Sequence, residues 1–290
     1  MKHHNETKKQ LILGLVLNSS FAVIELIGAL ISNSLALLTD ALHDFTDTIA
    51  LSLSLYANKK SMQKPSKTKT FGYGRAAIIA ALMNAVILVA ITIFIFYKAY
   101  QKIIHPERVN GTVIFIIALF GIVFNGIIVL KMWKTKEKDI NIRVVFWHLM
   151  EDVLGWIGIL IAGIVIIFTG WYIIDPIISI IIGFVVIYGA YGIIKEALDV
   201  FMLAVPSGID ISEVIKEIKR LPKIIDAHDM HIWTLGSNHY ALSGHLLVND
   251  AKISKTYPLL CEVNKLLKKK FNITHTTIEF ECKNCKRVCY

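Results

Sequence analysis

Two copies of one pattern, a histidine followed four residues later by an aspartate, lie in separate hydrophobic stretches of the chain. The copies are His43 with Asp47 and His148 with Asp152. On an α-helix, residues i and i+4 share a face, so each copy directs an imidazole and a carboxylate the same way. Brought together, the two copies would supply two nitrogens and two oxygens, a set suited to tetrahedral Zn²⁺. Because ionisable groups at membrane depth are costly, we interpret them as an ion pathway rather than as polar links between helices.

The elements that must position these pairs are transmembrane helices. Hydrophobic residues make up 55% of the 290 residues and form long runs. Each run is near the ~20 residues that a helix needs to cross the hydrocarbon core of a bilayer. We expect an α-helical membrane protein without a cleavable signal peptide. Its six transmembrane helices are predicted at about Leu11–Ile31, Leu35–Tyr56, Ala76–Tyr97, Val113–Met132, Val144–Phe168 and Tyr172–Ile194.

Basic residues in the predicted loops orient these helices. The N-terminal segment and the second and fourth loops are rich in Lys and Arg, the first and fifth loops carry none, and the third carries Lys98, Lys102 and Arg108. The positive-inside rule therefore places both termini in the cytoplasm. This topology also accounts for much of the net charge of +9. We expect no nucleic-acid partner, because the basic residues lie at the ends of the spans and no binding motif accompanies them.

From about Val205 onward, charged residues alternate with short apolar runs, which is typical of a small soluble domain. The periodicities predict an α+β domain of ferredoxin-like order, αββαβ. We divide the chain into a cytosolic N-terminal tail (1–10), a transmembrane domain (11–204), a cytosolic metal-binding domain (205–281) and a cysteine-containing tail (282–290). The predicted elements of the third part are Ile211–Arg220, His228–Leu235, Tyr240–Val248, Tyr257–Phe271 and Thr274–Phe280.

Taken together, these motifs resemble those of the cation diffusion facilitators, a family of zinc-exporting proton antiporters. The resemblance covers nearly the whole chain. It is carried by Ser34–Asp47 in the second span, Thr70–Arg75 before the third, His148–Asp152 in the fifth and Asp175-Pro176 in the sixth, then by Ala227–Trp233, Ser243–His245 and Thr277–Glu281. It implies that His43, Asp47, His148 and Asp152 form the transport site, that zinc is preferred, and that the chain is a homodimer in the plasma (inner) membrane.

A mechanism follows from the chemistry of histidine. Imidazole must be neutral to bind metal, and its ordinary pKa of about 6.5 lies near the pH values on the two sides of a cell membrane. Metal binding therefore releases protons, and protonation expels the metal. An inward proton gradient would then drive Zn²⁺ out, which makes Zn²⁺, protons and the lipid bilayer the expected partners.

Other polar residues of the spans have structural alternatives. Asp40 is a candidate hydrogen-bond partner beside the transport site, and a role in packing the span is the alternative. Glu25 and Asn84 would line the interior and face the cation path, although interhelical hydrogen bonds are the default role for such residues. Tyr73 occupies a loop position where some relatives have a metal-binding histidine, which argues against a metal site in that loop.

The soluble domain carries a second set of candidate ligands. By resemblance, His228 and His245 on neighbouring strands meet Glu281, after the last strand, around a metal, with Glu279 and His275 as further candidates nearby. The tail adds Cys282, Cys285 and Cys289. In a reducing cytosol this spacing predicts soft-metal ligation rather than a disulfide, and an unmetallated tail is the alternative.

Three other functions compete with zinc export. A membrane metalloenzyme is disfavoured, because the sequence has no H-E-x-x-H and four protein ligands leave no position for water or substrate, so we do not expect an enzyme. A membrane zinc sensor would need no transport site in the spans. Export of Mn²⁺, Fe²⁺, Co²⁺ or Cd²⁺ stays open, because ligand type biases metal selectivity without fixing it.

Overall fold

A computed structural model describes residues 18–61, 63, 65–133, 140–236 and 239–282, without the side chains of residues 54, 55, 58, 140–145 and 148. The described residues form two compact units. One contains residues up to Ser52 together with Met83–Gly192, and the other contains Leu53–Leu82 and the residues from Ile193 onward.

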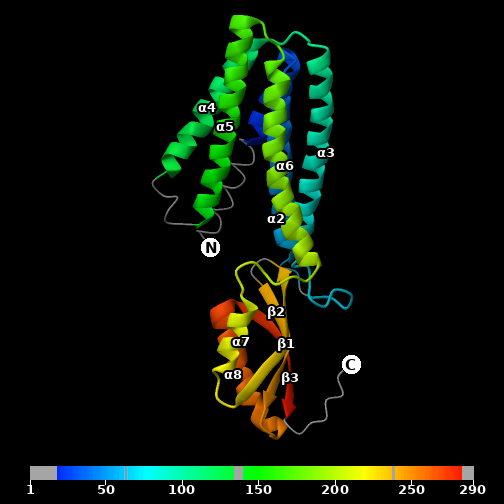
Figure 1. The fold of residues 1–290 in the computed structure, drawn as a ribbon, viewed down its shortest axis with the longest axis vertical. Helices are drawn as coiled ribbons and strands as arrows, with labels where there is room; N and C mark the ends of the chain where they lie inside the picture. Colours follow the sequence, from blue (N-terminus) through cyan, green and yellow to red (C-terminus); the bar gives the residue numbers. More distant parts are fainter. Residues whose placement is uncertain (1–17, 62, 64, 134–139, 237–238, 283–290) are drawn as a thin grey trace. The chain divides into compact units, whose positions relative to one another are not determined.

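Helices and the loops that join them make up the described residues between 18 and 201 (Figure 1). A first helix is described over Asn18–Ser32. It is followed by α2 (Leu35–Ser61), α3 (Ala76–Ile104), α4 (Gly111–Met132), α5 (Ile140–Thr169) and α6 (Ile174–Phe201).

Four segments of the described chain are long and apolar enough to cross a membrane: α3, α4, Leu149–Thr169 of α5, and α6. The sequence predicted six spans, so this number is only partly matched. The first helix is described only from Asn18, which leaves it short. In α2, Asp40, Asp44 and Asp47 interrupt the apolar sequence within two helical turns. The polar residues that reduce the hydropathy of α2 are the same ones that give it candidate chemistry.

Glycines let α4 and α5 approach closely. A Cβ on Gly111 would lie 2.9 Å from the carbonyl oxygen of Gly163, and a Cβ on Gly121 would overlap the ring of Trp156. Trp156 is only 1% exposed and belongs to a core that also contains Phe21 and Leu37. Small residues at helix contacts are typical of membrane bundles, in which packing rather than water exclusion drives helix association.

The start of α2 is tied to the start of α6 by a buried carboxylate. Asp175 in the first turn of α6 accepts hydrogen bonds from the Ser34 hydroxyl and from the backbone N–H groups of Leu35 (2.7 Å) and Ala36 (3.3 Å). These N–H groups have no partner within their own helix, so a carboxylate placed there satisfies them and complements the helix dipole. These hydrogen bonds hold the start of α2, the helix that carries His43 and Asp47, against the start of α6.

The described residues of the second unit that follow α6 form a three-stranded sheet and two helices. Its elements follow the predicted order: α7 (Ile211–Lys219), β1 (Ile224–Gly236), β2 (His239–Val248), α8 (Ile253–Phe271) and β3 (Ile273–Cys282). The sheet order is β1-β2-β3, with β1 antiparallel and β3 parallel to β2. Both helices pack on one face of the sheet, around a core that includes Val214, Ile218, Leu242, Leu246, Val263 and Leu267 (Figure 1).

The loop before α3 closes onto the end of β1 within this unit. Arg75 donates two hydrogen bonds to the carbonyl oxygen of Thr234, from Nε at 3.1 Å and Nη2 at 2.8 Å. A Cβ on Gly74 would collide with the backbone at Leu235 and Gly236, so the two chain segments lie in backbone contact. The loop is therefore held by the same strand that carries His228.

Candidate metal sites

The first candidate site begins with two residues on one face of α2. Nε2 of His43 lies 3.8 Å from Oδ2 of Asp47, and the side chains are 18% and 27% exposed. In a tetrahedral zinc site with bonds of about 2.0–2.2 Å, ligand atoms lie roughly 3.4 Å apart. A small adjustment of rotamers would therefore let both atoms bind one ion.

α5 lies beside α2 and runs in the opposite direction. The backbone N–H of Asn110, just before α4, donates to the carbonyl oxygen of Ser32, just before α2, so both helices start at the same end. Gly111 at the start of α4 packs against Gly163 near the end of α5, which places the end of α5 there as well. A Cβ on Gly155 would lie 3.7 Å from Oδ1 of Asp40, so α2 and α5 meet at this level.

This antiparallel contact places the His43–Asp47 motif of α2 and the His148–Asp152 motif of α5 at the same level along the two helix axes. Moving one turn from Asp40 along α2 leads to His43, and moving one turn back from Gly155 along α5 leads to Asp152, each about 5 Å along its axis. Asp152 is half-buried on α5, and Asp40 interacts electrostatically with Asp152, Asp44 and Asp47. His148 belongs to α5, one further turn from Asp152, but its side chain lies outside those that the structure describes.

In the loop before α3, the ring of Tyr73 lies beside two lysine side chains. The ammonium groups of Lys60 and Lys69 lie 5.3 Å and 5.0 Å from the centre of the Tyr73 ring. Cation–π contacts of this kind stabilise positive charge, which repels a metal ion. The expectation that this loop lacks a metal site stays a prediction.

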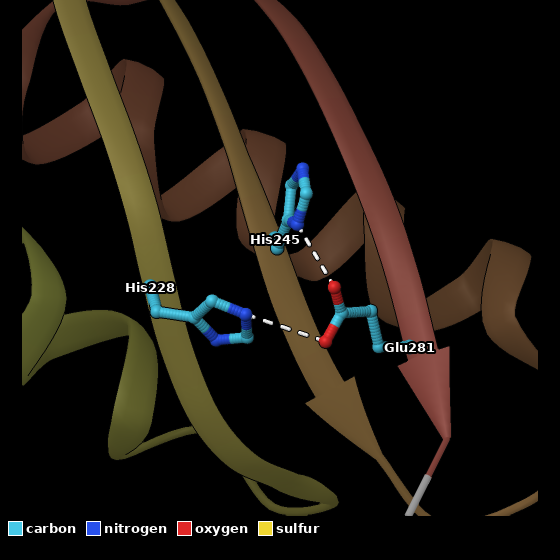
Figure 2. Close-up of side chains that lie close together, drawn as sticks. All are labelled: His228, His245 and Glu281. Atoms are coloured by element: carbon cyan, nitrogen blue, oxygen red, sulfur yellow. Dashed lines mark hydrogen bonds and ion pairs between the residues drawn. The ribbon is translucent and has the colours of Figure 1, made fainter. Parts of the chain in front are cut away.

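The second candidate site lies on the sheet face that the helices leave uncovered. His228 on β1 is paired directly with His245 on β2, and Glu281 lies on β3 (Figure 2). Their neighbours Ala227, Leu246 and Phe280 pack toward the helices, so alternation along the strands turns the three candidate ligands the other way. The prediction placed Glu281 after the last strand, which is wrong, because β3 continues to Cys282.

Glu281 bridges the two imidazoles. Its Oε1 lies 2.9 Å from Nδ1 of His245 and its Oε2 lies 3.3 Å from Nε2 of His228, as Figure 2 shows. One ligand atom from each of the three side chains lies within 4.8 Å of the others. Two nitrogens and one carboxylate oxygen at such spacings match three corners of a tetrahedral zinc site, so the residues fit the metal.

More carboxylates surround this triad. Asp226 Oδ2 lies 3.9 Å from Nδ1 of His228, while Asp229 Oδ2 and Glu279 Oε2 lie 3.8 Å and 3.7 Å from Nε2 of His245. Nδ1 of His228 is buried and has no hydrogen bond among the described residues. In metal sites, a carboxylate that accepts a hydrogen bond from the second ring nitrogen orients the histidine and raises its basicity, and these three carboxylates lie slightly beyond that distance.

The sequence interpretation did not assign Asp226 or Asp229 a role. Asp229 has φ = 51° and lies in the irregular stretch of β1 between His228 and His231. Left-handed backbone is uncommon outside glycine, and aspartate is one of the few residues that tolerate it. The distortion directs the Asp229 carboxylate toward both His245 and His231 (3.1 Å). An Asp beside a strand histidine was a weak signal, because regular alternation would have turned it to the other face.

Lys219 on α7 fixes the Asp226 carboxylate at 2.7 Å. This hydrogen bond, together with one from the backbone N–H of Ala227, holds the pKa of Asp226 below its ordinary value of 3.8. The carboxylate is therefore ionised at neutral pH and places a negative charge 3.9 Å from Nδ1 of His228.

The cysteine tail is only partly described. Cys282 ends β3 and is disulfide-bonded in the structure, so its sulfur is not a free thiolate. The sequence predicted metal ligation rather than a disulfide at this residue. Cys285 and Cys289 lie outside the described residues, and the metal site of the tail stays a prediction.

Comparison with known proteins gives matches along almost the entire chain. Residues 11–202 match the family model of the cation efflux transmembrane domain, and residues 206–282 match that of the cation efflux protein cytoplasmic domain. The chain is 34% identical to the cation efflux system protein CzcD of Alcaligenes sp. (strain CT14), over 98% of this chain and 90% of that protein.

Two further relatives carry more specific names. The chain is 36% identical to the cadmium, cobalt and zinc/H(+)-K(+) antiporter of Bacillus subtilis, over 96% of this chain and 91% of that protein. It is 32% identical to the zinc transporter ZitB of Pectobacterium atrosepticum, over 98% of this chain and 89% of that protein.

Proposed function

The chain belongs to the cation diffusion facilitator (cation efflux) family of multi-pass membrane transporters, and on that premise we propose that it exports Zn²⁺ from the cytoplasm in exchange for protons. The observation that carries the proposal is the His43–Asp47 pair on α2, facing an antiparallel α5 with Asp152 at the same depth. His148, one turn from Asp152, supplies the fourth ligand. The first helix and α2 complete a bundle of six spans, with both termini in the cytoplasm of the plasma (inner) membrane.

Each ligand has a distinct role in the proposed cycle. Asp47 and Asp152 offset the charge of the dehydrated ion, because a divalent cation in a low-dielectric site needs anionic ligands. His43 and His148 bind Zn²⁺ only when neutral, so they couple metal occupancy to pH. Protons arriving from the outer side then displace the metal, and the site returns to the cytoplasmic side carrying protons.

The soluble domain, which we assign to residues 205–281, holds a resident Zn²⁺ through His228, His245 and Glu281. Bound zinc would link β1, β2 and β3 through one ligand from each strand. Its positive charge would also offset the repulsion among the surrounding carboxylates. We propose that this domain also forms the homodimer contact, as the family of the cytoplasmic domain suggests, and that zinc occupancy tunes transport. We propose no part in dimerisation or in the regulation of transport for the N-terminal tail (1–10) or for the tail from residue 282.

Export of other divalent metals is the second candidate function. It is favoured by the names of relatives that include cadmium and cobalt. Nitrogen and oxygen ligands accept several borderline metals, and affinity follows the general order of the first-row ions unless geometry intervenes. Competition of Cd²⁺, Co²⁺ and Mn²⁺ with Zn²⁺ in the flux assay below ranks these substrates.

The decisive experiment measures Zn²⁺ flux in proteoliposomes under an imposed pH gradient, for the wild type and for Asp152→Ala. We expect gradient-driven flux in the wild type and a loss of at least about 100-fold in the variant, because one anionic ligand is gone. Glu151→Gln, which removes an exposed charge beside Asp152, serves as the matched control. Equal flux in the wild type and Asp152→Ala would contradict the proposed site, and no flux in either would contradict zinc–proton exchange.

A further inference from the structure

Glu25, in the first helix, is a buried carboxylate that the proposed transport cycle does not use. Its side chain is completely inaccessible to solvent. Both carboxylate oxygens are buried, and neither has a hydrogen-bond partner among the described residues. A carboxylate in this position is expensive to keep in a membrane bundle unless it has a partner or a bound ion.

The first helix and α2 form an antiparallel pair that fixes the depth of Glu25. Nδ2 of Asn18 donates to the carbonyl oxygen of Asp44 at 3.3 Å and to the hydroxyl of Thr48 at 3.2 Å. Glu25 lies seven residues beyond Asn18, about 10 Å along the helix axis. The same distance back along α2 from the Asp44–Thr48 level leads to residues 37–41, which include Asp40.

The described charged groups that interact with Glu25 are acidic. Its carboxylate interacts electrostatically with Asp44 and Asp40 on α2 and with Asp152 on α5. Asp40 is itself only 6% exposed and lies against α5 at Gly155. No Lys or Arg occurs in residues 18–58 or 149–169, so none of these three helical segments supplies a cation. Among the described residues of these segments, neither Lys nor Arg offsets the carboxylate, which favours an external cation as its partner.

We propose that Glu25 and Asp40 bind a hard counter-cation, a proton or an alkali ion, at a position separate from the metal site at His43 and Asp47. The proposal rests on the exchange mechanism proposed above and adds to it, because it places a further returning cation beside the protons carried by His43 and His148. Two carboxylates without an imidazole form an all-oxygen set, which suits hard cations rather than zinc. In the proposed topology Asp40 lies one turn nearer the outer end of α2 than His43, on the side from which the counter-cation enters.

Cation binding tests the site without requiring transport. In the purified, zinc-free full-length protein, we would count protons taken up between about pH 8 and pH 5, and radioactive sodium or rubidium retained at neutral pH. We expect Glu25→Gln to bind one cation fewer per protomer in one of these three measurements, and that measurement identifies the cation. Equal counts for the wild type and Glu25→Gln in all three would overturn the proposal.

Zinc titration and flux complete the test. Glu25→Gln should bind as many zinc ions as the wild type, and loss of one zinc ion would overturn the proposal by making Glu25 a metal ligand. In proteoliposomes, we expect at least a tenfold weaker response of zinc flux to a gradient of the cation that the variant fails to bind, with Glu151→Gln unchanged. An undiminished response would refute the counter-cation role. Absence of wild-type flux would refute the proposed export instead, and the cation counts would still decide whether Glu25 is a cation site.

Discussion

At Glu281 a single carboxylate contacts two imidazoles, and the histidines in turn have their own carboxylates. His228 has Asp226 near its second nitrogen, and His245 has Asp229 and Glu279. Metal-bound histidines usually need such partners to hold the correct tautomer. The triad therefore carries the features of a metal site even though each side chain alone would pass as an ordinary polar residue of a sheet.

The residue-scale prediction concerns His228. We expect His228→Ala to weaken zinc binding at the soluble site by at least about 100-fold, because a nitrogen ligand is lost and Glu281 keeps only one imidazole partner. Isothermal titration of the full-length protein measures this change. His231→Ala is the matched control, because His231 is on the same strand but 66% exposed and paired only with Asp229 in the described contacts. A similar effect of both variants would show that the triad is not the ligand set.

At the scale of elements, close helix contacts fix the depth at which the motifs of α2 and α5 meet. α4 supports α5 through Gly111 and Gly121, which lie against Gly163 and Trp156. Packed helices resist displacement because side chains leave few voids into which a neighbour could move. A change in this contact should therefore affect stability and the alignment of the transport site together.

Gly121→Ala tests this contact. We expect the variant to lose about 1–3 kcal/mol of stability, because its Cβ would overlap the Trp156 ring and the core must shift. Denaturant unfolding in detergent measures the loss. Gly126→Ala on the same helix is the control, since its Cβ would meet no atom within 4 Å. Equal stability of the two variants would mean that α4 and α5 are less closely packed than described.

A second prediction at this scale concerns the link between α7 and α8. Glu217 on α7 accepts hydrogen bonds from Lys270 on α8 and from Arg220. The bond from Lys270, supported by the charges of Arg220 and Lys216 against a partial opposing effect of burial, lowers the pKa of Glu217 below 4.5. A lowered folded-state pKa contributes stability above the unfolded value of about 4.5, and that contribution is lost as pH falls through the folded-state pKa.

We therefore expect acidification below about pH 4.5 to weaken the contact between α7 and α8. In Glu217→Gln, we expect the contact to be weakened already at neutral pH. Hydrogen exchange of the α7 amides in the full-length protein, compared between variants at each pH, provides the measurement. Glu213→Gln, an exposed acid on the same helix, should behave like the wild type. Unchanged protection in Glu217→Gln would contradict a stabilising role for the pair.

At the scale of the whole molecule, the charge distribution along the sequence determines the proposed orientation, in which both termini face the cytoplasm. The soluble domain carries a reporter of this orientation, because Cys261 on α8 is free and exposed. In a variant with Cys282, Cys285 and Cys289 replaced by serine, we expect a membrane-impermeant maleimide to label Cys261 in inside-out vesicles. Labelling in intact right-side-out cells would reverse the proposed topology, and permeabilised cells give the reference level.

The sequence alone was sufficient for features that depend on local pattern. Apolar runs of bilayer length identified a helical membrane domain, because a helix of about 20 residues crosses the hydrocarbon core with every backbone hydrogen bond made within the segment. Periodicity gave the order of α7, β1, β2, α8 and β3, although the strands extend further than predicted. The spacing of His43 and Asp47 was informative by itself, since four residues on a helix always bring two side chains to one face.

Tertiary structure decided what depends on contacts between distant segments. The pairing of His228 with His245 is a matter of strand register, and the position of Asp229 depends on a local irregularity that breaks the alternation of side chains. The depth of Asp40 against Gly155 depends on how α2 and α5 pack, and the isolation of Glu25 depends on every helix that surrounds it. The physical reason is that a periodic pattern fixes the face on which a side chain lies, whereas its partners are fixed by the packing of whole elements, which no local spacing encodes.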